Sequence, residues 1–367
     1  MNLRLPLSHD YVESSTSFRL PQQAIAVSNA VQMWFSEAYI NGLEIPDFLV
    51  LNTLKPLLSL VYQYFSTLLI MDDWVIQESD DLAEDSRHLM RLQYNLPTEL
   101  FRLMLGESYQ IYPKYSVGLW EKEATTLEEA QKTMLDDLIE KAGITDGDEI
   151  LDIGCGWGSA SNYILSKFPN VRITAINLSQ TQCAYMRQKM QEPDSYLSSH
   201  RFTLIEEDFN TVYLANQFDR IITIGFFEHV GNLTKSFAKM ANFLKKDGQV
   251  FLHIISFQLP HNGMAPFIDK YIFPRMRVWH YDAVPAHEQH FKVIDRWFLD
   301  GYNYAQTLRC WLKNFDAHQE ELKNLDYGIE YQKFRRMWRL YLLWCIAYFE
   351  ACKGKVLGNA QYLMKVV

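Results

Sequence analysis

The sequence predicts an α/β fold with a parallel, doubly wound sheet between residues 144 and 257. Apolar runs rich in β-branched residues alternate there with segments of helical periodicity, and this alternation is typical of βαβ units. The first apolar run, 149–153, passes directly into a glycine cluster. Because sheets of this kind bind ligands at the carboxyl ends of their strands, we expect a ligand site there.

Four strands and three helices are expected in this region. The strands are 149–153, 172–177, 220–224 and 249–255, and the helices are 159–168, 181–190 and 234–244. Each strand run is short, apolar and rich in isoleucine or valine, as is usual for strands buried on both faces. We therefore expect this core, residues 142–257, to hold the sheet and the ligand site.

Helical stretches flank the core on both sides. Those before it are 24–38, 54–70 and a helix that begins near Thr126, where acidic residues suit the helix dipole. Those after it are 304–315 and 334–349, followed by a short strand at 360–367. We divide the rest of the chain into an N-terminal helical region (1–90), a helical segment covering the ligand (91–141), and a substrate cap that completes the sheet (258–367). The aromatic residues of the cap are expected to form ordinary core or to enclose a hydrophobic substrate.

The composition narrows the classes of function. The 367 residues contain 35 Lys and Arg against 44 Asp and Glu, which gives a net charge of −9. Since nucleic-acid binders normally carry a basic excess, nucleic acid is not an expected partner. The apolar region 48–74 is interrupted by polar residues, so no transmembrane segment is expected. Peripheral contact with a membrane through a local patch stays open.

Cysteine and histidine usage favours neither disulfides nor a metal site. The five cysteines form no CxxC pair, which suits a reducing compartment, and we expect a cytoplasmic enzyme. Four histidines, at 261, 280, 287 and 290, are irregularly spaced and have no accompanying carboxylate or cysteine frame. No metal is therefore expected.

The motif Leu151-Asp-Ile-Gly-Cys-Gly-Trp-Gly158 carries the strongest functional signal. Gly154 and Gly156 allow a tight turn and a close approach of a ligand to the backbone. The spacing is GxGxG rather than the GxGxxG of dinucleotide-binding folds, and no phosphate-binding lysine follows. The second strand ends in Asn177, where an NAD-binding protein would carry an acidic residue.

These departures point to a nucleoside without a pyrophosphate, and S-adenosylmethionine fits this description. Its sulfonium and amino groups suit an acidic pocket, for which Asp152 at the strand end is available. Its adenine can lie beside a polar and aromatic pair such as Asp208 and Phe209.

Three ordered motifs resemble a known methyltransferase family: the glycine turn 152–158, Asn177-Leu-Ser-Gln-Thr-Gln182 and Phe227-Glu-His-Val-Gly231. From about Tyr94 onwards the chain is similar to the family of cyclopropane-fatty-acid synthases, mycolic-acid methyltransferases and plant coclaurine N-methyltransferases. The resemblance implies a class I methyltransferase (Rossmann-like) fold that uses S-adenosylmethionine and releases S-adenosylhomocysteine. The first 90 residues carry no such resemblance.

The resemblance also implies which residues bind the cofactor. They are Tyr115 and Ser116 at the methionine end, Asp152, Gly154 and Gly156 at the glycine turn, Asn177, Leu178 and Gln182 beside the ribose, Asp208 and Phe209 beside adenine, and Ile224 at the pocket floor.

On the reacting side, the resemblance implies catalytic roles for Glu228, His229, His253 and Tyr304. In the cyclopropane synthases, the residues matching Glu228, His253, Ile255 and Tyr304 hold a bicarbonate ion that removes a proton from a carbocation. This chain departs from the family at Val117, which replaces a cysteine, and over 275–281, where the usual loop sequence is absent. We therefore expect an acceptor pocket that differs from the familiar ones.

Three functions follow from the resemblance. The leading hypothesis is N-methylation of a small hydrophobic amine, with Glu228 and His229 removing a proton or orienting the amine. The alternative is methylation or cyclopropanation of an unsaturated fatty acyl chain of a lipid, with bound bicarbonate as the base. The third is a cofactor-binding protein without catalysis. A homodimer stays open in all three.

The two catalytic hypotheses predict different pockets. An acyl-lipid acceptor requires an exposed apolar entrance with a basic rim, for which Lys270, Arg275 and Arg277 form the nearby cluster. An amine acceptor requires a closed aromatic pocket with Glu228 facing it.

Overall fold

The protein is described here by a computed structural model. It describes residues 22–43, 45–65, 78–79, 82, 94, 96–121, 124–215, 217–259 and 265–367. The predicted helix 54–70 beyond residue 65, most of residues 66–95 and His261 lie outside the described residues.

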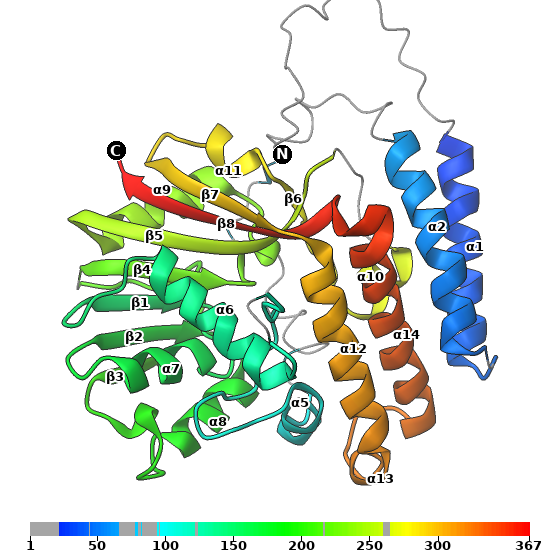
Figure 1. Ribbon diagram of the computed structural model, residues 1–367, viewed down its shortest axis with the longest axis horizontal. Helices are drawn as coiled ribbons and strands as arrows, with labels where there is room; N and C mark the ends of the chain where they lie inside the picture. Colours follow the sequence, from blue (N-terminus) through cyan, green and yellow to red (C-terminus); the bar gives the residue numbers. More distant parts are fainter. Residues whose placement is uncertain are drawn as a thin grey trace, which may run out of the picture.

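One mixed sheet runs through the described part of the chain, with the strand order β3-β2-β1-β4-β5-β8-β7 (Figure 1). The parallel strands are β1 (Glu149–Ile153), β2 (Arg172–Asn177), β3 (Phe202–Glu206), β4 (Phe218–Ile224) and β5 (Leu244–Phe257). β6 (Trp279–His280) pairs in parallel with β5, while β8 (Leu357–Val366) lies antiparallel between β5 and β7 (Phe291–Leu299). The chain order reverses between β1 and β4, which is where open α/β sheets bind their ligands.

Helices cover both faces of this sheet. The helices of the core are α6 (Leu127–Lys141), α7 (Ser159–Lys167), α8 (Gln180–Lys189) and α9 (Leu233–Phe243). Two buried hydrophobic clusters follow from this layering, one containing residues of α6, α7 and α8, and the other containing residues of α9. The short helices η2 (Tyr196–Ser198), η3 (Phe227–His229) and α11 (Ala283–Ala286) connect the strands.

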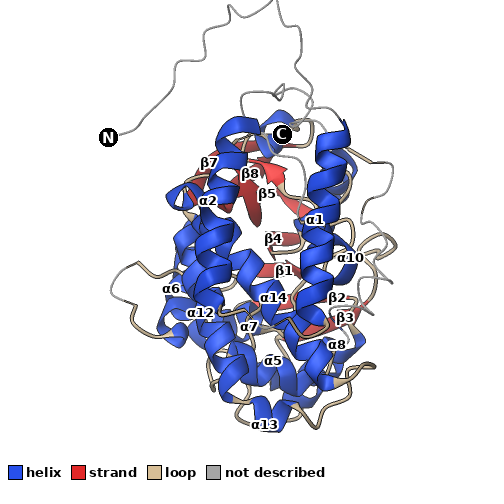
Figure 2. Cartoon of the chain, turned by 90° about the vertical axis from the view of Figure 1, so that its right-hand side faces the viewer, coloured by secondary structure: helices blue, strands red, loops and turns tan. Residues whose placement is uncertain are grey.

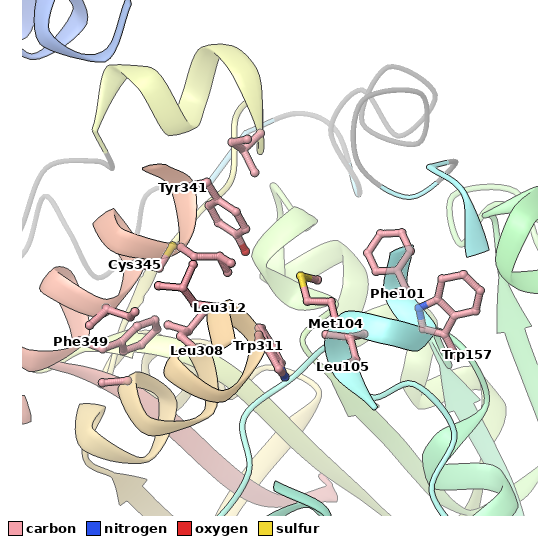
Figure 3. Packing of buried hydrophobic residues seen from close by; sticks show 14 of the residues in the cluster. Phe101, Met104, Leu105, Trp157, Leu308, Trp311, Leu312, Tyr341, Cys345 and Phe349 are labelled. Carbon is pink, nitrogen blue, oxygen red and sulfur yellow. The ribbon is translucent and has the colours of Figure 1, made fainter. Parts of the chain in front are cut away.

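A second group of helices stands beside the sheet. It contains α5 (Thr98–Leu105), α10 (Pro266–Tyr271), α12 (Gly301–Ala317), α13 (Gln319–Leu322), α14 (Tyr331–Glu350) and η4 (Ala351–Gly354). Side chains from α12 and α14 face those of α5 and of the glycine turn across a continuous apolar core (Figure 3). Phe101 of α5 contacts Trp157 of that turn at a ring-centroid distance of 5.2 Å. This packing ties the cap helices to the ligand-binding edge of the sheet.

Two N-terminal helices, α1 (Gln22–Ile40) and α2 (Asp47–Phe65), pack along the outer side of α14 (Figures 1 and 2). Asp47 at the start of α2 accepts hydrogen bonds from Arg339 of α14, at 2.8 and 2.6 Å. Lys55 of α2 lies 3.1 Å from Glu350, the last residue of α14. In the part of the chain that the structure describes, no helix combines the length and apolarity needed to cross a bilayer.

The predicted parallel, doubly wound sheet is confirmed. β1 and β2 have the predicted bounds, and β8 begins three residues before the predicted strand 360–367. β3, β6 and β7 were not among the predicted strands. β7 is an edge strand with exposed charged residues such as Lys292 and Asp295, so its sequence lacks the continuous apolar run that marks the central strands.

Candidate functional site

A cavity lies at the carboxyl ends of the parallel strands, and it brings together every residue for which the sequence predicts cofactor binding. Its walls include Tyr115, Ser116, Asp152, Gly154, Gly156, Asn177, Leu178, Gln182, Asp208, Phe209 and Ile224. Most of them follow from topology, because β1, β2, β3 and β4 all end at this edge. Tyr115 and Ser116 come from the extended segment between α5 and α6. We call this space the first cavity.

The glycine turn shapes one wall of the first cavity. Gly154 has φ +73°, and a Cβ atom there would lie 2.7 Å from the Cβ of Phe226. Gly156 has φ +57°, but a Cβ there would meet no atom within 4 Å. Gly154 is therefore required both for its conformation and for close packing, whereas Gly156 leaves open space beside the backbone.

Polar side chains at the ends of β1 and β2 are held in fixed positions. Asp152 is buried and accepts a hydrogen bond of 2.7 Å from Ser161, and burial raises the pKa of its carboxyl to about 7. Asn177 donates to the backbone oxygen of Gly156 and to Oε1 of Gln182, at 2.9 Å each. These bonds join the end of β2, the first turn of α8 and the glycine turn into one rigid wall.

The sequence analysis did not identify Lys114 as a residue of this cavity. Its side chain is buried in the cavity wall, and Nζ donates to Oγ of Ser116 at 2.8 Å and to the backbone oxygen of Val117 at 2.5 Å. Burial lowers the pKa of Lys114 to about 7. Its position directly before Tyr115-Ser116 was the available signal, but the sequence does not show that the lysine is buried.

A second cavity adjoins the first and contains all four predicted catalytic residues, Glu228, His229, His253 and Tyr304. The two cavities share wall residues, namely Tyr94, Tyr115, Ser116, Gly225 and His229. Aromatic and apolar side chains form much of the remaining wall: Ile255, Ile268, Phe273, Met276, Leu308, Tyr341, Cys345, Phe349 and Leu357. Tyr341, Cys345, Leu308 and Phe349 enter from α14 and α12 (Figure 3).

Burial shifts the pKa values of Glu228 and of its neighbour His229 in opposite directions. Oε1 of Glu228 accepts a hydrogen bond of 2.7 Å from the backbone N–H of Ile255, and Oε2 has no hydrogen-bond partner among the described residues. Burial raises the pKa of Glu228 to about 7. Burial lowers the pKa of His229 to about 4, and its Nε2 lies 2.9 Å from the hydroxyl oxygen of Tyr94. Near neutral pH, His229 is therefore uncharged and Glu228 can exchange a proton.

A buried network fixes the tautomer of His253. Lys141 donates to Oε1 of Gln361 at 2.6 Å, which orients the amide so that Nε2 of Gln361 faces Nδ1 of His253 at 3.3 Å. Nδ1 accepts this hydrogen bond, and the ring proton lies on Nε2. Nε2 has no hydrogen-bond partner in the described part of the chain. His253 is therefore a neutral donor whose pKa is held low by burial.

Aromatic contacts position the hydroxyl groups of the second cavity. Tyr304 stacks on Phe349 with ring centroids 4.4 Å apart, and burial raises its pKa. The hydroxyl groups of Tyr115 and Tyr341 lie 3.0 Å apart and link the segment before α6 to α14. These phenols remain neutral donors at physiological pH.

The loop that departs from the family pattern contributes to the second cavity. Met276 lines it, and the backbone N–H of Arg277 donates to the backbone oxygen of Glu228 at 2.7 Å. Lys270, which the lipid hypothesis places on a basic rim, lies 3.1 Å from Glu37 of α1. The loop therefore supports Glu228 through its backbone.

Within the described residues, the structure brings none of His280, His287 and His290 into a metal-type cluster. No group of three or more His, Cys, Asp or Glu side chains suited to an ion occurs there. Nδ1 of His287 lies 2.7 Å from the backbone oxygen of Ala283, as expected for a structural histidine.

Comparisons with known proteins agree with this architecture. Residues 82–357 match the family described as mycolic acid cyclopropane synthetase. The cyclopropane-fatty-acyl-phospholipid synthase of Escherichia coli K12 is 33% identical over 70% of this chain, which spans 63% of that enzyme's length. The (S)-coclaurine N-methyltransferase of Papaver somniferum is 27% identical over 71% of this chain and 76% of its own length.

Two solved structures share the fold. A coclaurine N-methyltransferase bound to N-methylheliamine and S-adenosylhomocysteine superposes with a TM-score of 0.80 at 24% identity, over 91% of this chain and 99% of its own. A cyclopropane synthase of Mycobacterium tuberculosis superposes with a TM-score of 0.66 at 27% identity, over 78% of this chain and all of its own.

Proposed function

The chain belongs to the mycolic acid cyclopropane synthetase family, and from this premise we propose that it is an S-adenosylmethionine-dependent methyltransferase that N-methylates a small hydrophobic amine. The observation that carries this proposal is Glu228, a buried carboxyl whose Oε2 has no partner among the described residues, in the wall of an aromatic cavity. That cavity adjoins the one that suits the cofactor.

The first cavity suits S-adenosylmethionine in shape and in charge. The Cβ positions of Gly156 and Gly225 meet no atom within 4 Å, so backbone and ligand can approach closely there. A buried carboxyl, Asp152, and a buried amine, Lys114, lie in the same walls. When bound, the cofactor supplies a methyl group already activated by the sulfonium, so the protein contributes mainly orientation and removal of water.

The second cavity contains a proton acceptor and aromatic side chains, both of which suit an amine acceptor. Most amines are protonated at neutral pH and lack a free electron pair in that form. Glu228, with a pKa of about 7, can take this proton at Oε2 when it is ionised. The neutral ring of His229 orients the acceptor, and the faces of Tyr304 and Phe273 favour the cationic product through cation–π contacts.

One specific observation favours the alternative, an unsaturated fatty acyl chain of a lipid with bicarbonate as the base. Nε2–H of His253, Oε2 of Glu228 and the phenol of Tyr304 all border the second cavity, as the family resemblance implies for a bound bicarbonate. The basic rim required for an anionic lipid surface is weak, because Lys270 is paired with Glu37 and the Arg277 guanidinium lies over the Trp279 ring at 5.6 Å. We therefore keep the amine as the leading acceptor.

The test is incubation of the purified protein with S-adenosylmethionine and two acceptor pools, hydrophobic amines and unsaturated phospholipid vesicles. Mass spectrometry follows methyl incorporation and release of S-adenosylhomocysteine. Methylated amine with unchanged lipid is the expected result. Modified acyl chains would replace the leading acceptor with the alternative, and cofactor binding without turnover of either pool would favour the non-catalytic hypothesis.

A further inference from the structure

Lys114 is a buried cation that lacks an anionic partner within the described residues. Its side chain is 4% exposed, and its two hydrogen-bond acceptors, Ser116 Oγ and the Val117 backbone oxygen, are both neutral. An ammonium group has three donors, so one remains for another acceptor. No carboxylate in the described part of the chain forms an ion pair with this lysine.

Other cations in comparable surroundings are paired. Lys141, whose side chain is 16% exposed, lies 2.8 Å from Asp137, and Arg339 is bonded to both Asp47 and Asp316. Burying a charge without a counter-ion is strongly unfavourable. A lysine in these surroundings either loses its charge or receives a counter-ion, and the place of Lys114 in a cavity wall points to a ligand that brings the missing negative charge.

The same cavity holds the complementary group. Asp152 is 2% exposed, and the neutral Ser161 hydroxyl donates a hydrogen bond to its carboxyl group. Asp152 and Lys114 both line the first cavity, yet they form no ion pair with each other, since no nitrogen–oxygen contact within 4.0 Å joins them among the described residues. A cavity with separate positive and negative groups suits a zwitterion whose two charges are held apart.

The amino acid moiety of S-adenosylmethionine is such a zwitterion. We propose that Lys114 binds the α-carboxylate of the cofactor, while Asp152 faces its α-ammonium group. This inference rests on the proposed function and adds a recognition residue that the sequence motifs do not include. Ser116 accepts a hydrogen bond from Lys114 and so holds the ammonium group of Lys114 in position at the boundary of the two cavities.

The protonation state of Lys114 agrees with this role. Burial alone lowers its pKa to about 7, so part of the population is neutral at physiological pH when no anion is present. Contact with a carboxylate raises the pKa of a lysine and keeps it charged. Binding of the α-carboxylate therefore replaces the counter-ion that the fold does not supply.

The experiment compares two ligands on three proteins by isothermal titration calorimetry. The ligands are S-adenosylhomocysteine and its decarboxylated analogue, which keeps the amine, ribose and adenine but lacks the carboxylate. The proteins are the wild type, Lys114→Met, and Lys313→Met on the exposed surface of α12 as a matched control that makes the same substitution away from both cavities. Thermal unfolding is recorded for each protein. Lys114→Met is expected to unfold at no lower temperature than the wild type, because an apolar side chain of similar length replaces a buried cation.

We expect the wild type to bind S-adenosylhomocysteine about 10- to 100-fold more tightly than the analogue, as is usual for a charge-assisted hydrogen bond. Lys114→Met loses this preference and binds the analogue as the wild type does, whereas Lys313→Met keeps the preference. Equal weakening of both ligands by Lys114→Met would show a structural role and overturn the inference, as would a wild type without preference. A wild type that binds neither ligand would overturn the proposed function itself.

Discussion

At the scale of single residues, burial gives neighbouring groups very different pKa values. Glu228 and His229 are adjacent in η3, yet the pKa of the carboxyl rises to about 7 and that of the imidazole falls to about 4. Both shifts come mainly from desolvation, which disfavours the charged form of each group. A pair whose pKa values are moved in this way gives one group that exchanges protons near pH 7 and one that stays neutral.

The pH dependence of methyl transfer follows from Glu228. In the proposed mechanism the carboxylate is the proton acceptor, so the rate should rise with pH around the pKa of about 7 and level off above it. An aliphatic amine acceptor, which stays protonated over this range, requires the proton transfer that we assign to Glu228. Initial rates of Glu228→Gln should be lower and should not level off near pH 7, because only the free amine then reacts. A limb of wild-type shape in the variant would assign the titration to another group.

Glu228 should also make the fold less stable as the pH rises. Its pKa in the folded state lies above the ordinary value of 4.5, so its contribution to stability is present below about pH 4.5 and is lost as the pH rises through about 7. Glu228→Gln should therefore unfold with a free energy up to about 3 kcal/mol larger than the wild type at pH 8. Urea unfolding at pH 8 and pH 5 measures this difference. A variant that is less stable than the wild type at both pH values would contradict it.

At the scale of elements, the strands of the core are predictable because their apolar runs are continuous and end in glycine or asparagine. β1 and β2 show this most clearly, and their ends position Asp152, Gly154 and Asn177. β3, with the partly exposed sequence Phe-Thr-Leu-Ile-Glu, and the charged edge strand β7 lack that signal. Their place in the sheet is decided by pairing with β2 and β8, which local sequence does not reveal.

The glycine turn should tolerate no side chain at Gly154. Alanine there combines the strain of φ +73° with a Cβ that lies 2.7 Å from Phe226. We expect Gly154→Ala to weaken S-adenosylhomocysteine binding by more than about 10-fold, equivalent to about 1.4 kcal/mol. Gly106→Ala is the matched control, because Gly106 has φ +77° but its Cβ would meet nothing within 4 Å. Equal effects of the two substitutions on binding would show that strain alone matters.

The start of α6 should contribute measurably to stability. Thr126 accepts a hydrogen bond from the backbone N–H of Glu129, and the Glu129 side chain returns to the Thr126 backbone, forming a capping box. Thr126→Ala should lower the free energy of unfolding by about 1 kcal/mol, as measured by urea unfolding. Thr126→Ser, which keeps the hydroxyl, should remain close to the wild type. A loss in both variants would point to the methyl group instead of the cap.

At the scale of the whole molecule, α14 connects the N-terminal helices to the second cavity. Arg339 of this helix bonds to Asp47 of α2 and Asp316 of α12, while Tyr341 and Cys345 line the cavity two and six residues further on. The acceptor space is therefore assembled from segments more than a hundred residues apart. Sequence motifs locate the side chains that we propose as catalytic, but they do not show which of the many aromatic residues meet there.

Tertiary packing also explains why the sequence does not mark Lys114 as a residue of the cavity. Its burial results from the packing of the segment before α6 against the sheet and α12, where Gly118 and Trp120 bond to Thr307 and Asn303. No local pattern in the sequence marks a lysine that is buried by tertiary structure.

The cytoplasmic location, a homodimer and peripheral membrane contact stay predictions.

The most direct test uses one substitution to separate cofactor binding in the first cavity from methyl transfer in the second. Affinity for S-adenosylhomocysteine and the rate of methyl transfer are measured in parallel on the wild type, Glu228→Gln and, as a control, Glu321→Gln on the exposed surface of α13. We expect Glu228→Gln to bind S-adenosylhomocysteine within about 3-fold of the wild type while transfer falls about 100-fold or more. The control should match the wild type in both. Loss of binding in Glu228→Gln would place this residue in cofactor support and contradict its role toward the acceptor.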